Sequence, residues 1–239
     1  MSQRAVEHYL RPGTLNLPAL PPLALYVHLP WCLKKCPYCD FNSHELSSAK
    51  TGAVVPLRFV PGPAAEQLPR ATDPQALGVP PHGSPASVAG GAALGDRLAD
   101  AVPQAGYLQA LRADLEAALP LVWGRPVVSV FIGGGTPSLF SPDSIDCLLA
   151  DIRALLPLQP RCEITLEANP GTFERERFRA YRAAGVTRLS IGVQSFDDAS
   201  LNAIGRVHDG QQARDAIEEA RSAFDTFNID LMYALPGQT

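Results

Sequence analysis

The sequence predicts an α/β fold built on a parallel β-sheet. Five apolar segments of strand length alternate with stretches whose apolar residues recur at helical spacing, which is typical of consecutive β/α units. The strands are nearly continuous apolar runs, as expected where both faces are covered. Five such units fit part of a barrel or a doubly wound sheet, and in either fold the functional side chains gather where the strands end. The strands are expected at residues 23–28, 126–132, 162–167, 186–193 and 227–232.

The helices between these strands are marked by their apolar faces and their caps. One face consists of Tyr107, Leu111, Leu115, Ala118 and Leu119, and the next of Ile145, Leu148, Leu149, Ile152, Leu155 and Leu156. Ser141 followed by Pro142 and Asp143 is typical of a helix start. Gly185 is expected to end a later helix as its C-cap. Further helices are expected over 172–184, near 197–204 and over 211–224.

Two segments depart from this pattern. Residues 1–22 contain several prolines and no continuous apolar stretch, so we expect a flexible N-terminal lead-in rather than a signal peptide. Residues 46–105 contain 29 Pro, Gly and Ala among 60 residues, with Phe59 as the only aromatic. Such a composition buries too little surface to offset its ordering entropy, which predicts a long disordered insertion. The folded core is therefore expected over 23–239, interrupted by 46–105.

Length and charge narrow the class of protein. A chain of 239 residues suits one large α/β domain or two small ones. Its formal net charge of -4 gives no basic field to attract nucleic acid or anionic lipid. No apolar run reaches the ~20 residues that span a bilayer, so we expect no transmembrane segment and a cytoplasmic location. Cys147 and Cys162 lie apart among apolar residues and are expected to be small buried core residues.

The most informative stretch follows the first predicted strand. Cys32, Cys36 and Cys39 have C-x3-C-x2-C spacing, so their thiolates can converge on one metal centre. An odd number of crowded cysteines argues against a structural disulfide. Two centres remain: an iron–sulfur cube with one iron left open, or a closed zinc site completed by His28 or His44. An open iron takes an exchangeable ligand, and in radical chemistry that ligand is S-adenosylmethionine (SAM), whose sulfonium is cleaved by an electron from the cluster.

Polar or glycine residues follow every predicted strand and are expected to share one rim. The Gly-Gly-Gly-Thr run at 133–136 leaves no Cβ in the way, so a ligand could lie against its backbone. The alternative is a tight strand-to-helix turn. Glu167 and Asp230 are carboxylates at the ends of apolar strands, where an unpaired charge is costly. Ribose hydroxyls or a cationic amino group would satisfy them, as would a structural network with Arg188 or Arg206.

Three further side chains are candidates for contacting the same ligand. Tyr26 precedes the cysteine loop and could position a ligand carboxylate through its hydroxyl. Tyr38, inside the loop, offers an aromatic face for an adenine ring, or packs the loop onto the barrel. Gln194 could hydrogen-bond a ribose, or tie its strand to the following loop. His28 and His208 have no metal-type spacing with each other, and we expect both to be hydrogen-bonded structural residues.

Five motifs together resemble a known family. They are YVHLPWC at 26–32 continued by CDFNSH at 39–44, FIGGGTPS at 131–138, EITLEANPG at 163–171, RLSIGVQSF at 188–196 and NIDLMY at 228–233. The sequence resembles radical SAM proteins of the oxygen-independent coproporphyrinogen III oxidase-like family, and most closely the HemW haem-chaperone branch. The resemblance covers nearly all of the chain outside 46–105.

This resemblance implies both a site and a fold. By it, Cys32, Cys36 and Cys39 hold a [4Fe–4S] cluster. The positions implied to contact SAM are Tyr26, Tyr38, Gly134, Gly135, Thr136, Pro137, Glu167, Gln194, Arg206 and Asp230. The implied fold is the radical SAM core, a partial (β/α)6 TIM-like barrel, here truncated after about five β/α units.

One departure from the family bears on function. Coproporphyrinogen oxidases continue the loop to a fourth cysteine, and Phe41 stands at that position. The substitution places the chain with the haem chaperones and argues against oxidative decarboxylation of coproporphyrinogen III. The implied partners are SAM, an electron donor, haem and a haem-acceptor protein. Two alternatives stay open: an oxidase of porphyrin biosynthesis, and an inactive truncated fragment.

Overall fold

The computed structural model describes residues 21–46 and 101–238 of the chain. Its centre is a sheet of five strands, each parallel to its neighbours, in the order β1-β4-β5-β6-β7. The strands are β1 (Leu23–Leu29), β4 (Val127–Gly134), β5 (Leu158–Ala168), β6 (Arg188–Gln194) and β7 (Thr226–Leu231). Strand order follows chain order, without the reversal that marks a doubly wound sheet, so the sheet is a segment of a barrel wall. The predicted α/β fold with a parallel sheet is confirmed.

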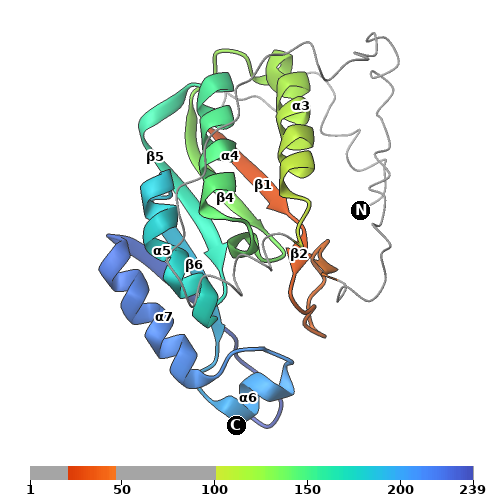
Figure 1. The fold of residues 1–239 in the computed structure, drawn as a ribbon, viewed down its shortest axis with the longest axis vertical. Helices are drawn as coiled ribbons and strands as arrows, with labels where there is room; N and C mark the ends of the chain where they lie inside the picture. Colours follow the sequence, from red (N-terminus) through yellow and green to blue (C-terminus); the bar gives the residue numbers. More distant parts are fainter. Residues whose placement is uncertain (1–20, 47–100, 239) are drawn as a thin grey trace.

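The long helices cover one face of this sheet (Figure 1). The helices are α3 (Gln104–Val122), α4 (Pro142–Leu155), α5 (Thr172–Ala184), the short α6 (Asp198–Ala203) and α7 (Gly210–Ala223). Ser141 caps α4 by accepting a hydrogen bond from the backbone amide of Ser144, and Gly185 ends α5 in the left-handed conformation, with φ of 108°. Both caps agree with the prediction. Within the described ranges, no helix has the length and apolar character needed to cross a bilayer.

Several boundaries differ from the prediction. Helix α3 begins at Gln104, so the last residues of the predicted insertion are helical. Strand β4 continues to Gly134, two residues past its predicted end. Strand β5 begins at Leu158, four residues early, because a register shift lets this residue pair with the start of β4. Residues 1–20 of the predicted lead-in and 47–100 of the predicted insertion lie outside the described residues.

The two isolated cysteines have different environments. Cys162 is buried, as predicted, whereas Cys147 is exposed and the prediction for it was wrong. Cys147 belongs to α4 but lies off the buried stripe of that helix, which consists of Ile145, Leu148, Leu149 and Ile152. Its apolar neighbours in the sequence therefore pack inward while its thiol faces solvent.

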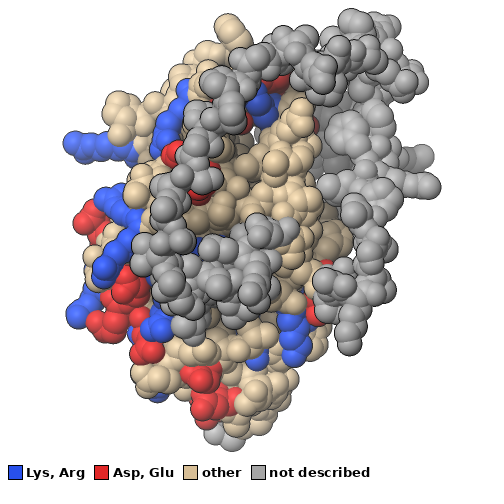
Figure 2. Space-filling model, in the orientation of Figure 1, with Lys and Arg blue, Asp and Glu red and all other residues tan. Residues whose placement is uncertain are grey.

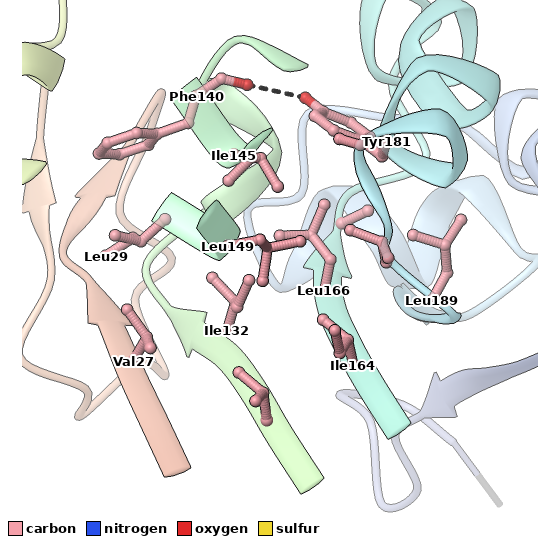
Figure 3. Packing of buried hydrophobic residues seen from close by; sticks show 14 of the residues in the cluster. Val27, Leu29, Ile132, Phe140, Ile145, Leu149, Ile164, Leu166, Tyr181 and Leu189 are labelled. Atoms are coloured by element: carbon pink, nitrogen blue, oxygen red, sulfur yellow. Dashed lines mark hydrogen bonds between the residues drawn. The ribbon is translucent and has the colours of Figure 1, made fainter. Parts of the chain in front are cut away.

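A hydrophobic core lies between the sheet and the helices (Figure 3). Strand residues Val27, Leu29, Ile132, Ile164, Leu166 and Leu189 meet Ile145 and Leu149 of α4 there. Beyond the carboxyl end of β4, the buried hydroxyl of Tyr181 donates hydrogen bonds to the carbonyls of Ser138 and Phe140, at 2.8 and 2.9 Å. These bonds tie α5 to the 3-10 turn η2 (Pro137–Leu139), so the core fixes the turn that follows the glycine run.

Charged side chains of both signs interleave on the face formed by α5 and α7 (Figure 2). Among the described side chains, ion pairs that link α5 to α7 or to the residues just after it include Arg175–Asp215, Arg179–Glu219 and Arg182–Asp225, at 3.1, 3.0 and 3.0 Å. Exposed pairs of this kind contribute ~0–1 kcal/mol each. They therefore align the two helices more than they stabilise the fold.

Candidate functional site

The cysteine loop is closed by a small second sheet that the sequence pattern did not indicate. Strand β2 (Trp31–Cys32) pairs in parallel with β3 (His44–Glu45), so the two ends of the loop lie side by side. Inside the loop, the Lys35 ammonium donates hydrogen bonds to the carbonyls of Phe41 and Ser43, at 3.3 and 3.2 Å. The segment that carries the cysteines is thereby held in one compact turn.

His28 joins β1 to this loop. Its Nε2 lies 2.7 Å from the carbonyl oxygen of Asn42, and since a carbonyl only accepts, the ring proton is on Nε2. Its Nδ1 then accepts a hydrogen bond from the Tyr26 hydroxyl at 3.1 Å. The Tyr107 hydroxyl donates to the backbone carbonyl of His28 at 2.6 Å. Both ring nitrogens are engaged in the protein, which is the structural role predicted for His28.

The three thiols of the loop differ in exposure and in their polar neighbours. Cys32 is buried, and burial raises the pKa of its thiol, although hydrogen bonds from Thr136 and Ser43 act in the opposite direction. Cys36 and Cys39 are partly exposed. The sulfur of Cys39 lies 3.8 Å from the Ser43 hydroxyl. The hydroxyl of Thr136, outside the loop, and that of Ser43, inside it, therefore lie close to these sulfurs.

One cavity receives all three thiols and the carboxyl ends of the strands. Its lining consists of Cys32, Lys34, Cys36, Tyr38, Cys39, Phe41, Gly134, Gly135, Thr136, Pro137, Glu167, Ala168, Asn169, Ser190, Gly192, Gln194, Arg206 and Asp230. Every residue that the sequence placed in the cofactor site is part of this lining except Tyr26. The shared rim expected from a parallel sheet is therefore present in the described part of the chain.

Two carboxylates line this cavity, Glu167 of β5 and Asp230 of β7, from the strands on either side of β6. Glu167 accepts a hydrogen bond from the backbone amide of Gly134 at 3.0 Å. Burial raises the pKa of Glu167, and the charge of Asp230 raises it further, against that hydrogen bond and the nearby His28. This part of the cavity is consequently negative and favours a cationic or hydroxyl-bearing group.

Asp230 is held by neutral side chains rather than by an arginine. Ser190 donates to one of its oxygens at 3.2 Å, and the Asn228 amide donates to the other at 3.0 Å. Arg188 binds Asn228 at 2.7 Å and Glu163 at 3.2 Å. The structural network expected as an alternative for Asp230 thus exists, but Arg188 reaches it only through Asn228, and Arg206 binds other partners.

The glycine run packs closely against the protein's own backbone. A Cβ on Gly135 would lie 2.6 Å from the carbonyl oxygen of Trp31, and one on Gly134 would lie 2.8 Å from the His28 ring. Gly134 also has φ of 120°, where side chains are strained. The amides of Gly135 and Thr136 donate to the carbonyls of Leu29 and Trp31, at 2.8 and 2.7 Å. The glycines therefore let the turn after β4 lie against the start of the cysteine loop while also lining the cavity.

The chain is similar to known proteins over most of its length. Residues 103–239 match the Radical SAM superfamily. The chain belongs to this superfamily. Membership implies a [4Fe–4S] cluster and SAM. It decides between the two metal centres that the sequence left open, in favour of the cluster.

Relatives within the superfamily agree with the predicted branch. The haem chaperones HemW of Haemophilus influenzae and Escherichia coli are 39% and 40% identical, over 93% and 92% of this chain. The chain covers 46% and 45% of those relatives, less than half of their length. A solved structure of coproporphyrinogen III oxidase (HemN) from Escherichia coli, a radical SAM enzyme, matches with a TM-score of 0.61 and 27% identity, over 91% of this chain and 38% of that chain.

The donor set of the loop fits a radical SAM cluster. Three soft thiols open onto one cavity, and thiolates are the ligands that iron–sulfur clusters select. To complete a zinc site through either ring nitrogen, His28 would have to give up the hydrogen bond that this nitrogen makes, to Tyr26 or to Asn42. The cavity also carries the polar side chains that a small zwitterion with hydroxyl groups requires.

Arg206 lines the radical SAM cavity beside the cysteine loop. One terminal nitrogen donates to the Asn169 side-chain oxygen at 2.8 Å and to the Gly192 carbonyl at 2.6 Å. The other lies 3.7 Å from the sulfur of Cys36. Burial raises the pKa of Tyr38 to about 12, and the Arg206 charge opposes the rise. Tyr38 and Arg206 therefore share one corner of the site with Cys36.

Of the two remaining candidates, Gln194 lines the cavity and Tyr26 lies outside it. Gln194 has φ of 65°, a conformation that costs a non-glycine residue ~1–3 kcal/mol. Its carbonyl accepts from the Met232 amide at 2.9 Å, so Gln194 does tie β6 to the chain after β7 while lining the cavity. Tyr26 is 57% exposed and stacks on Phe131, with ring centroids 6.2 Å apart, outside the lining.

Sequence reasoning missed four residues of the lining. These are Lys34, Ala168, Ser190 and Gly192. Ser190 and Gly192 alternate with the apolar residues Leu189, Ile191 and Val193 along β6, so the period of two along that strand was a usable signal. Lys34 belongs to an irregular loop, where no periodicity indicates a direction.

Proposed function

We propose that Cys32, Cys36 and Cys39 bind a [4Fe–4S] cluster with one iron left without a protein ligand, and that SAM binds in the adjoining cavity. The observation that carries this proposal is that the three thiols line the same cavity as Glu167 and Asp230. When bound, the cluster and SAM supply the reductive cleavage of the sulfonium, which protein side chains cannot perform.

The side chains of the cavity would divide the work of binding SAM. Glu167 and Asp230 would attract its amino group or ribose hydroxyls, because both carboxylates lie in one negative part of the cavity. Arg206 lies across the cavity beside Cys36 and would favour the carboxylate of SAM. Tyr38 would offer an aromatic face to the adenine. Gly134, Gly135, Thr136, Pro137 and Gln194 would complete the wall, and Tyr26 would act through His28 from outside it.

The relationship to HemW supports a wider proposal. The protein would act as a haem chaperone that binds haem and passes it to an acceptor protein, and a separate electron donor would reduce the cluster. The similarity to HemN supports a second candidate, oxidation of coproporphyrinogen III. Phe41 argues against this oxidase, because it lines the cavity at the loop position where the oxidases have their fourth cysteine.

Anaerobic reconstitution followed by electron paramagnetic resonance (EPR) tests the core proposal. The reduced protein is expected to give a [4Fe–4S] signal that changes when SAM is added. Cys36→Ser should abolish the signal, and Cys147→Ser, which changes an exposed cysteine outside the loop, should leave it intact. A signal that ignores SAM, or tightly held zinc in place of iron, would contradict the proposal.

Two assays of the reconstituted protein distinguish the haem chaperone from the oxidase. Saturable haem binding followed by transfer to an apo-haemoprotein supports the chaperone. Release of CO2 from coproporphyrinogen III in the presence of SAM and reductant supports the oxidase. A cluster-bearing protein that does neither restricts the function of this chain to SAM binding.

A further inference from the structure

The turn after α6 reaches across the cavity and closes on the cysteine loop. Gly205 has φ of 73°, and a Cβ on it would lie 2.8 Å from the Pro37 ring. Only glycine therefore lets this turn approach the residue that follows Cys36. The amide of Arg206 donates to the carbonyl of Leu201 at 3.0 Å, which fixes the turn to its own helix.

This turn aims a guanidinium at one sulfur of the loop. The Nη2 of Arg206 donates to two acceptors, the side-chain oxygen of Asn169, just after β5, at 2.8 Å and the carbonyl of Gly192 in β6 at 2.6 Å. Because the guanidinium is planar and rigid, these two bonds also set the direction of Nη1, which lies 3.7 Å from the sulfur of Cys36. The Asn169 amide is itself anchored by donating to the Thr136 hydroxyl at 3.1 Å.

The other two cysteines have neutral polar neighbours in the described structure. Cys32 is near the hydroxyls of Thr136 and Ser43, and Cys39 is near Ser43. Cys36 alone of the three has a cationic donor among the contacts of the described residues. Hydrogen bonds to cluster sulfurs and local charge are among the factors that set the reduction potential of an iron–sulfur cluster.

We propose that Arg206 sets the reduction potential of the cluster through its charged hydrogen bond to Cys36, in addition to any contact with SAM. This inference rests on the proposed function, since it requires a cluster on the three thiols. Reduction adds one electron to the cluster, and a neighbouring cation stabilises the more negative form. Arg206 therefore raises the potential and makes the cluster easier to reduce.

The test is a redox titration of the reconstituted protein, with dithionite as reductant, followed by EPR without SAM. Arg206→Gln is expected to lower the equilibrium constant for reduction about tenfold, which is a midpoint about 59 mV more negative for a one-electron couple. Omitting SAM ensures that a lost SAM contact cannot cause the shift. Arg206→Lys keeps the positive charge but loses the planar set of N–H donors of the guanidinium, and should give an intermediate midpoint.

Arg182→Gln is the matched control for net charge. Arg182 pairs with Asp225 just before β7, far from the cysteine loop. The reduction midpoint of the cluster in this variant should therefore equal that of the wild type. A midpoint unchanged in Arg206→Gln would overturn the inference. If that variant holds no cluster, an unchanged midpoint in Arg206→Lys would do so. Wild-type protein that takes up no iron and sulfide would instead refute the proposed function itself.

Discussion

The carboxylate of Glu167 accepts a hydrogen bond from the backbone amide of Gly134 across the β4–β5 pair, at 3.0 Å. The pKa of Glu167 is nevertheless raised, chiefly by burial. The ionised carboxylate therefore costs folding free energy at neutral pH. Residues that destabilise an empty site while serving its ligand are typical of binding sites.

Glu167→Gln should stabilise the protein without cofactors and weaken its binding of SAM. At a pH above neutral, removing the ionised group should raise the melting temperature by about 2 °C. The gain should shrink as the pH falls through the raised pKa, because the wild-type carboxyl then takes up a proton and loses its penalty. Thermal melts across pH and SAM binding to the reconstituted protein measure the two effects. Lower stability than the wild type at every pH would contradict this account.

Gly135→Ala should be strongly destabilising. The added Cβ would meet the carbonyl oxygen of Trp31 at 2.6 Å. Both atoms are fixed by the backbone, so the start of the cysteine loop and the turn after β4 would have to separate. We expect a loss of about 1–3 kcal/mol in unfolding free energy by urea titration. Gly106→Ala is the matched control, since nothing lies within 4 Å of its Cβ position in α3, and it should gain about 0.5–1 kcal/mol. Equal effects at the two positions would refute the close approach.

Tyr181→Phe should destabilise the fold through a single lost hydroxyl. That hydroxyl donates to the carbonyls of Ser138 and Phe140 in a fully buried position. Leaving buried carbonyl oxygens without this donor costs about 1–3 kcal/mol, measurable as a lower urea midpoint. Tyr233→Phe removes the same atom from a side chain that is 89% exposed and should change nothing.

His28→Leu should loosen the cysteine loop without removing a metal ligand. The variant loses the bond to Asn42 and leaves the Tyr26 hydroxyl without its acceptor. We expect the reconstituted variant to bind iron in the same ratio but to release it to a chelator about tenfold faster. His44→Gln alters the other histidine considered as a zinc ligand, which is exposed in β3, and should behave as the wild type. A lower iron ratio in either variant would show that the histidine is a ligand.

Local signals in the sequence were sufficient for the helices and for the rim. Ser141 and Gly185 act through their own backbone neighbourhood, so their caps could be predicted without the fold. The rim could be predicted because parallel strands all end on one edge. The exposure of Cys147 was also readable, since position 147 falls off the apolar stripe of α4.

Contacts between distant segments could not be predicted in the same way. The partners of Asp230 depend on the register of β6 against β7, which places Ser190 beside Asn228. The early start of β5 depends on a register shift against β4, over a polar stretch that does not alternate. The β2–β3 pair contains two residues in each strand, too few for any period to be recognised.

The bond between Arg206 and Cys36 joins positions 170 residues apart in the chain. Contacts of such sequence separation form late in folding, because the intervening chain must first be closed into a loop at a cost in entropy. The cysteine loop comes early in the chain, yet its final polar surroundings require β6 and α6 to be in place. Stable metallation should therefore follow folding of the barrel segment, and a nascent chain lacking α6 should hold its iron less firmly.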